Sequence, residues 1–203
     1  MRARDSDTLT IGELLARVRS TYVDSFAERL AKAARDSPGR LVPEAAVCAD
    51  GAELPAPGAL DLPQRVDACV FADGQVAGVM TFDSESMLAF EPLAIVWGDG
   101  LDVDLQPFTW DACELRFRPP DDGDLGPLTE WFRRWFDEGD ERALTNEFPG
   151  GVVHSISGPL EEGDHWVLTV DLGSARLKAF EELIDALAAI NRVRLVVGHP
   201  RLP

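Results

Sequence analysis

Positive charge is scarce in this sequence of 203 residues. Lys and Arg together number 19, against 36 Asp and Glu, which gives a formal net charge of −17. A surface of this sign repels the phosphate backbone of nucleic acids and the anionic headgroups of membranes. We therefore expect neither class of partner, and we expect electrostatic attraction to favour a protein with a basic surface.

Cysteine is scarce as well, and the sequence has no long hydrophobic run. Cys48, Cys69 and Cys113 are widely spaced and form no CxxC pair. An odd number of isolated thiols favours a reducing compartment over a disulfide framework. No apolar run is long enough to span a bilayer, and the first residues lack the apolar core of a secretory signal. We expect a cytoplasmic protein.

The common motifs of catalysis and nucleotide binding are absent. The sequence contains no GxGxxG, GKS/T, GxSxG or HExxH pattern. Gly150 and Gly151 precede a predicted strand, whereas a phosphate loop needs a helix N-terminus after it. A catalytic site assembled from distant residues stays open. The sequence predicts no cofactor, and it favours a non-enzymatic protein without deciding the question.

Potential metal ligands occur without the spacing of a known metal site. His154 lies in a predicted strand and His165 opens the next one, but the expected register offsets them and supplies no third ligand. Zinc sites use about three or four protein ligands. The acidic segments 99–104 and 121–124 lack the spacing of an EF-hand loop. We predict no metal site, and the sequence leaves open whether either histidine or either acidic segment binds an ion.

The first half of the chain contains a helix, an irregular stretch and a hairpin. Apolar residues recur every three to four positions over residues 11–35, which predicts an amphipathic helix. Residues 40–64 are rich in proline and glycine and predict a long irregular connection. Residues 66–71 and 76–82 flank an Asp-Gly pair suited to a type I′ turn, and they predict a hairpin. The apolar run 87–97 is partly strand.

The second half has a regular order of strands and helices. From residue 109 the patterns predict strand, helix, strand, strand, helix and strand, which is the order of the ferredoxin-like, or split βαβ, unit. Right-handed crossovers place both helices of such a unit on one face of an antiparallel sheet. The expected segments are strands 109–118, 152–157, 166–172 and 193–197, a helix at 125–137 and a helix from residue 174 onward.

These patterns predict an α+β protein with two regions in one compact body. Residues 1–105 form the region of the N-terminal helix, irregular loop and hairpin, and residues 106–203 form the ferredoxin-like unit. We expect the helix and hairpin to extend or cover the sheet. One curved sheet that runs through both halves is the alternative. A topology of this kind implies no activity by itself.

The negative charge is concentrated in one part of the chain. Residues 83–124 carry eleven Asp and Glu against two Arg, whereas residues 1–40 are mildly basic. This distribution is typical of a solvated acidic surface, and it also suits an acidic face that a basic partner recognises. Alternatively, the basic first helix neutralises the acidic segment within the fold.

The helix at 125–137 is unusually aromatic. A stripe of apolar residues is more often core than surface, but these aromatic residues span a wider arc than one stripe, and Trp and Arg are enriched at binding hot spots. Together with the acidic loop before the helix, they are the best candidates for an interaction surface. The predicted partner-binding residues are Trp131, Arg134, Trp135, Phe136, Asp121, Asp122 and Asp124.

Acidity, uneven charge and the lack of motifs favour a protein-binding module that is chaperone-like or inhibitor-like. In size, acidity and order of elements the chain is similar to type III secretion chaperones and to acidic immunity proteins of bacteria, although no residue motif carries the similarity. Two alternatives stay open. One is a small-molecule-binding protein or enzyme with a site on the sheet face, and the other is a self-associating subunit such as a homodimer.

Overall fold

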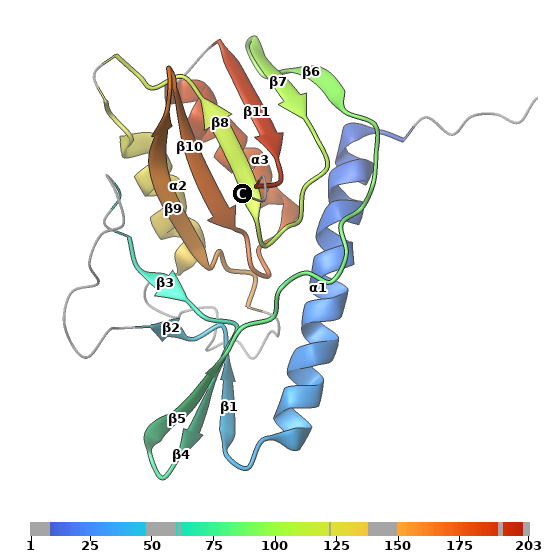
Figure 1. Cartoon of the computed structure of the whole chain (residues 1–203), viewed down its shortest axis with the longest axis vertical. Helices are drawn as coiled ribbons and strands as arrows, with labels where there is room; N and C mark the ends of the chain where they lie inside the picture. Colours follow the sequence, from blue (N-terminus) through green and yellow to red (C-terminus); the bar gives the residue numbers. More distant parts are fainter. Residues whose placement is uncertain are drawn as a thin grey trace, which may run out of the picture.

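The computed structural model of the chain describes residues 9–47, 60, 62–121, 123–137, 150–190 and 193–200. Within these residues the protein is α+β, with three helices, a six-stranded sheet, a three-stranded sheet and a short two-stranded ribbon. The larger sheet lies at one end of the molecule and the three-stranded sheet at the other, and the N-terminal helix runs beside both (Figure 1). No described helix is long and apolar enough to cross a membrane.

The N-terminal helix α1 (Ile11–Asp36) confirms the prediction for this segment. Its first turn is held by a capping box, in which the backbone amide of Glu13 donates to the Thr10 hydroxyl and the Thr10 amide donates to the Glu13 carboxylate. A stripe of seven side chains is buried along the helix. Arg19 donates to the backbone carbonyls of Ser174 and Ala175, at 3.0 and 2.6 Å, which ties the basic helix to the larger half of the molecule.

Two small β elements lie between α1 and the larger sheet in the sequence. The three-stranded antiparallel sheet contains β1 (Arg40–Pro43), β4 (Ala68–Ala72) and β5 (Gln75–Met80), in the order β1-β4-β5. The ribbon contains β2 (Ala46–Val47) and β3 (Gln64–Arg65). The β4–β5 turn has positive φ at Asp73 and Gly74, 52° and 78°, so the predicted hairpin and its turn are confirmed.

The prediction of an irregular stretch over residues 40–64 is wrong for the part that the structure describes. β1 pairs with β4, and β2 pairs with β3, so this segment contributes strands to two sheets. Such pairing depends on distant partners, which a local count of proline and glycine does not reveal. Residues 48–59 and 61, and with them Cys48, lie outside the described residues.

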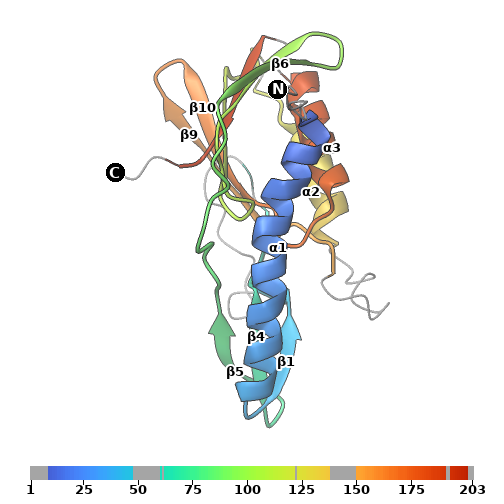
Figure 2. The ribbon, with the colours of Figure 1, turned by 90° about the vertical axis from the view of Figure 1, so that its right-hand side faces the viewer.

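The larger sheet has the strand order β6-β7-β11-β8-β10-β9. Neighbouring strands are antiparallel except β7 and β11, which are parallel. Helices α2 (Gly126–Phe136) and α3 (Leu177–Ile190) pack on one face, and α1 lies on the same side (Figure 2). The strands are β6 (Leu93–Trp97), β7 (Leu101–Leu105), β8 (Cys113–Phe117), β9 (Ser155–Glu162), β10 (His165–Asp171) and β11 (Arg194–Gly198).

The order of elements from β8 onward agrees with the predicted strand-helix-strand-strand-helix-strand order, but one strand is displaced. β9 begins at Ser155 and runs on to Glu162 before the turn at Gly163, so the bounds predicted for this strand, 152–157, are wrong. Gly158 lies inside β9 at φ 98°, where the register with β10 shifts, so this glycine marks a bulge instead of a turn. As a consequence His154 comes just before β9 and is not part of it.

The six-stranded sheet also contains β6 and β7, two strands that precede the predicted ferredoxin-like unit. β7 has the alternating pattern of a half-buried strand, with Leu101, Val103 and Leu105 buried. β6 and β7 precede residue 106, yet they belong to the same sheet as the four later strands. The β4–β5 hairpin lies in the separate sheet, so the expectation that it extends the larger sheet is wrong.

The main core lies between the six-stranded sheet and the helices. Alternate residues of β8, namely Cys113, Leu115 and Phe117, are buried as predicted. They pack with the inner faces of α2 and α3, both of which have one apolar stripe. The opposite face of the sheet carries no helix in the described part of the chain (Figure 2).

Candidate functional site

The aromatic side chains that α2 contributes to the predicted interaction surface lie inside the fold. Trp131, Trp135 and Phe136 are each at most 8% exposed. The indole nitrogen of Trp131 donates to the carbonyl of Ala179 at 2.8 Å, and that of Trp135 donates to the carboxylate of Glu182 at 3.0 Å. These bonds join α2 to α3, so the rings serve the packing of the two helices.

The polar members of the same predicted set reach the surface. Arg134 forms an ion pair with Glu182 at 3.1 Å. Asp121 is exposed, and Asp124 accepts a hydrogen bond from the backbone amide of Gly126 in front of α2. Asp122 lies outside the described residues. The structure therefore does not gather the seven predicted residues into one exposed patch.

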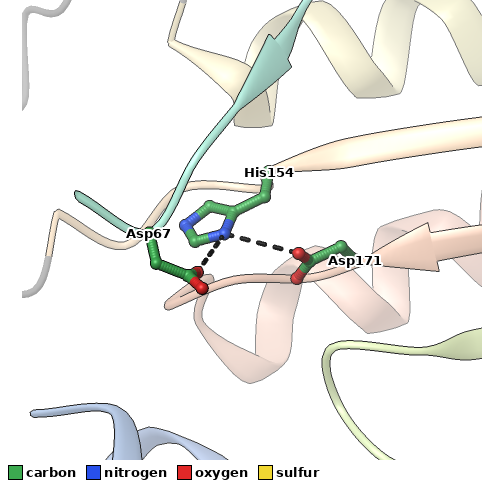
Figure 3. Close-up of side chains that lie close together, drawn as sticks. All are labelled: Asp67, His154 and Asp171. Carbon is green, nitrogen blue, oxygen red and sulfur yellow. Dashed lines mark ion pairs between the residues drawn. The ribbon is translucent and has the colours of Figure 1, made fainter. Parts of the chain in front are cut away.

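A different group of residues converges at the junction of the two sheets. His154 is 1% exposed, and its ring lies among the carboxylates of Glu44, Asp67 and Asp171. The ring nitrogen Nε2 is 3.0 Å from Oε1 of Glu44. The other nitrogen, Nδ1, is 3.2 Å from Oδ1 of Asp67 and 3.5 Å from Oδ2 of Asp171 (Figure 3). Buried charges of both signs are expensive unless paired, so this cluster is the strongest candidate for a functional site.

The backbone around His154 fixes the position of its ring. The His154 amide donates to the carbonyl of Asp171 at 2.9 Å, and its carbonyl accepts from the amide of Arg65 at 2.8 Å. Gly173 has a positive φ of 49°, and a Cβ atom there would lie 2.3 Å from Cδ2 of His154. Only glycine leaves room for the ring and also adopts this backbone conformation without strain.

Glu44 anchors one side of the cluster. It is 4% exposed, and its carboxylate accepts hydrogen bonds from the backbone amides of Gly150 and Ser174 at 2.6 and 3.3 Å. Burial by itself raises the pKa of Glu44, but the bond and charge of His154, together with these amides, outweigh burial and hold the pKa below its ordinary value. Both oxygens of Glu44 accept from backbone amides, so Nε2 of His154, 3.0 Å from Oε1, is assigned as the donor in their bond.

The two aspartates each have one oxygen held by the backbone. The amide of Phe82 donates to Oδ2 of Asp67, and the amide of Gly173 donates to Oδ1 of Asp171 at 2.8 Å. Burial raises the pKa of Asp171, and the neighbouring Asp67 adds to the rise, whereas the charge of His154 opposes it. Burial lowers the pKa of His154, but the charge of Asp171 and the hydrogen bonds within the cluster outweigh it and hold the pKa well above its ordinary value.

Arg65 is a second buried cation at the same junction, 7% exposed. Its guanidinium donates to the backbone carbonyls of Phe136, Glu44 and Asp137 at 2.8, 2.6 and 2.7 Å. It also lies over the ring of Phe136, 4.6 Å from the centroid. These contacts connect β3 to the end of α2, so Arg65 joins the small β elements to the main body.

A small pocket lies beside the cluster. Its volume is about 130 Å³. Tyr22 lines the pocket and is 5% exposed, and its hydroxyl makes no hydrogen bond within the described residues. Burial raises the pKa of this hydroxyl, and nearby carboxylates raise it further, foremost that of Asp171. The acidic residues that line the pocket are Asp67, Asp83, Asp111 and Asp171.

The second histidine singled out by the sequence belongs to a different place. His165 pairs with Glu162 at the beginning of β10, whereas Asp171 ends that strand beside His154. Nδ1 of His165 forms an exposed ion pair with Asp164 at 2.7 Å. The two histidines therefore do not share a site.

Sequence reasoning found His154 but not its partners. Glu44 lies in the segment predicted to be irregular, and Asp67 lies at the start of the predicted hairpin, where an acidic residue is unremarkable. Their carboxylates reach His154 only because β1, β3 and β10 end at the same junction. No spacing in the sequence signals this convergence.

The face of the six-stranded sheet away from the helices is a second candidate surface. It exposes Val96 on β6 and Leu160 on β9, with 69% and 65% of their surface accessible. Arg116 pairs with glutamates, Arg194 pairs with Asp104, and Arg118 just after β8 pairs with Asp164. The remaining charge of the face is acidic, with Asp102 exposed opposite Val96.

Comparisons of the chain with protein-family models, with curated proteins and with solved structures gave no match.

Proposed function

We propose that this protein is a cytoplasmic, non-enzymatic protein-binding module, chaperone-like or inhibitor-like, that recognises a basic partner through the uncovered face of its six-stranded sheet. The observation that carries the proposal is the exposure of aliphatic side chains on an otherwise acidic sheet face. The buried state of the two thiols that the structure describes, Cys69 and Cys113, supports a reducing compartment.

The exposed aliphatic groups are unusual for the solvent face of a sheet. One-sided antiparallel sheets generally alternate apolar residues inward with polar residues outward. Val96 and Leu160 break this alternation at the two outermost strands of the sheet, β6 and β9. When such a face binds a protein, exposed apolar groups contribute contact area and the charged groups between them contribute specificity.

The charge on this face supports a basic partner. Asp102, Asp104, Glu114 and Glu162 all project to it, as their pairing partners and ion pairs indicate. Two arginines offset only part of this charge. An acidic face increases the rate of association with a cationic surface and suppresses association with an anionic one.

The ferredoxin-like assignment of residues 113–198 is part of this proposal. The sub-order β11-β8-β10-β9 with antiparallel neighbours, and α2 and α3 on one face, supports it. In this arrangement the helices leave the other face free. The topology supports an available face but does not identify its partner.

The test is capture of the partner by the immobilised full chain, with variants that change only the exposed face. We expect the double variant Val96→Lys with Leu160→Lys to lose a basic partner that the wild-type chain retains. The matched control is Val76→Lys with Val79→Lys on β5, where the side chains are 56% and 53% exposed and lie on the other sheet. The control should retain the partner.

The dependence of binding on salt concentration is an independent measurement on the same complex. The Debye length falls from about 10 Å at 0.1 M ionic strength to about 3 Å at 1 M, so an interface steered by charge weakens over this range. A complex that does not respond to salt, or that is lost equally from both double variants, would contradict the proposal. Light scattering over a range of concentrations separates a basic partner from a second copy of the chain.

The pocket beside His154 favours a second candidate function, the binding of a small ligand. Its volume of about 130 Å³ is well below the roughly 300–1,000 Å³ of pockets for organic molecules. Four aspartates and Arg65 line it, so the charge of the lining is negative on balance and suits a cation. The ligand is therefore no larger than an ion with a few water molecules.

A further inference from the structure

Three potential metal ligands converge at the junction of the sheets. Asp67, His154 and Asp171 each offer one ligand atom, and these atoms all lie within 4.8 Å of one another (Figure 3). They come from the turn before β4, the residue before β9 and the last residue of β10. One imidazole nitrogen with two carboxylate oxygens is a mixed ligand set that zinc and related first-row ions accept.

The distances within this group suit a shared ion better than direct hydrogen bonds. Nδ1 of His154 is 3.2 Å from Asp67 and 3.5 Å from Asp171, whereas charge-assisted N–H···O bonds are about 2.7–2.9 Å long. Two ligands at about 2.0–2.1 Å from a tetrahedral zinc ion lie about 3.3–3.4 Å apart. The ring is 1% exposed, and among the described residues the contacts of this nitrogen are these two long ion pairs.

The orientation of the imidazole is that of a metal ligand. Nε2 of His154 donates to Glu44, which is itself held by the amides of Gly150 and Ser174. This bond holds Nε2 against Glu44 and turns Nδ1 toward the two aspartates, so that an ion binds there by displacing the proton on Nδ1. Metal-binding histidines very often donate their second nitrogen to a carboxylate in this way, which fixes the tautomer and the ring.

The aspartates are oriented in the same manner. One oxygen of Asp67 accepts from the amide of Phe82 and one oxygen of Asp171 accepts from the amide of Gly173, so in each case the other oxygen faces Nδ1 of His154. All three ligand groups are thus fixed by bonds to atoms that are not themselves ligands. Such prior orientation reduces the entropy lost when an ion binds.

The pocket supplies an independent sign of a ligand. Tyr22 lines it with a hydroxyl that is buried and has no hydrogen-bond partner in the described residues. Buried polar groups in native proteins are almost always paired, so an unpaired one calls for a missing partner. A water molecule bound to the ion as its fourth ligand is such a partner, and catalytic zinc sites keep this position for water.

We propose that Asp67, His154 and Asp171 bind a divalent transition-metal ion of the zinc type, with Glu44 as the positioning residue for the imidazole. The proposal rests on the second candidate function, the binding of a small cation in the pocket beside His154. It is independent of protein binding by the sheet face, which contains none of these residues.

The first experiment uses the full-length wild-type chain after removal of bound ions with a chelator. Calorimetric titration with Zn²⁺ should give one ion per chain, and Mg²⁺ and Ca²⁺ should bind more weakly because they prefer all-oxygen ligands. Co²⁺ in place of Zn²⁺ should give the visible absorption bands of a four- or five-coordinate ion with a nitrogen ligand. This spectrum needs no variant and therefore decides the matter even if a variant fails to fold.

Variants assign the site to the named residues. Removal of partners outside the first coordination sphere lowers metal affinity about 10–100-fold, so we expect that loss for Glu44→Gln and a loss above about 100-fold for Asp171→Asn. The carboxylate control is Asp185→Asn on α3, which lies outside the pocket and accepts from the indole of Trp97. The histidine control is His165→Ala, at the exposed pair with Asp164. Both controls should change zinc affinity less than about threefold.

Three results would overturn the proposal. They are an unchanged aqueous Co²⁺ spectrum with the wild-type chain, equal loss of zinc affinity in Asp171→Asn and Asp185→Asn, and loss of zinc binding in His165→Ala. The third result would place the ion on the surface. A failed metal titration would leave the capture experiment on the sheet face unaffected, so the two proposals fail separately.

Discussion

The core beneath the six-stranded sheet and the junction at its end are equally buried but are stabilised in different ways. In the core, Phe108 stacks on Phe180 and both are at most 2% exposed. At the junction, His154, Glu44 and Arg65 are at most 7% exposed, and each makes directed polar contacts. Apolar packing tolerates exchanges of similar volume. A buried charge that loses its partner has no such tolerance, so small changes at the junction should have large effects.

The largest expected effect is at Arg65. Arg65→Met keeps much of the side-chain volume but leaves the carbonyls of Phe136, Glu44 and Asp137 without this donor. We expect the free energy of unfolding to fall by about 3–5 kcal/mol. Urea denaturation measures the change, with the exposed Arg40→Met as the control, which should stay within about 0.5 kcal/mol. A loss below about 1 kcal/mol at Arg65 would show that the junction does not depend on this cation.

The next largest effect is expected at Gly173, where a control variant separates backbone strain from the space that the ring of His154 needs. Gly173→Ala places a methyl group on His154 at a residue with positive φ, so we expect a loss of about 2–4 kcal/mol. Gly74→Ala is the control, because Gly74 also has positive φ but a Cβ atom there has no neighbour within 4 Å. It should cost about 1–2 kcal/mol. If Gly173→Ala and Gly74→Ala lower the free energy of unfolding equally in thermal or urea unfolding, backbone strain alone explains why residue 173 is a glycine.

Glu44 and Asp67 show why the polar junction could not be predicted from the sequence, whereas the apolar core could. The stripes of α1 and α3 and the alternation of β8 follow from repeated burial of apolar side chains, which leaves a period in the sequence. Glu44, with its φ of 48°, and Asp67 occur once each, and both contact the distant His154. Their role depends on long-range strand pairing, and no local period records it.

The aromatic helix α2 is the opposite case, in which the sequence pattern is clear but the elements that cover the helix lie in the same chain. Its wide aromatic arc predicted an interaction surface, but Phe136 is covered by Arg65, and Trp131 is bonded to α3. The arc is wide because this helix contacts two different neighbours within the fold. Helical periodicity indicates how many faces are buried, and it does not say whether the covering element belongs to the same chain.

A smaller loss of stability is expected for Glu44→Gln, which changes the charge of the side chain but not its shape. Glu44→Gln is nearly isosteric but removes the negative charge that faces His154, so the bond from Nε2 loses its charged acceptor. Hydrogen bonds to charged groups contribute about 1.5–3 kcal/mol, against about 1 kcal/mol for neutral ones, so the loss should be about 1–2 kcal/mol. Chemical denaturation of the metal-free chain measures it, and a variant as stable as wild type would argue against a buried carboxylate here.

The smallest effect is expected in the core. Leu183 is fully buried beneath the sheet, and Leu183→Met conserves volume, so the loss should stay below about 1.5 kcal/mol. Its zinc affinity should equal that of wild type. If this exchange cost more than Glu44→Gln in the same denaturation experiment, the contrast between a tolerant core and an intolerant junction would be wrong.

The most direct test of the account is a crystal structure of the chain grown with Zn²⁺, with diffraction data on both sides of the zinc absorption edge. The account predicts an anomalous peak between Asp67, His154 and Asp171, with zinc–ligand distances of about 2.0–2.2 Å. A peak only at the exposed pair of His165 and Asp164, or no peak in the junction, would contradict it.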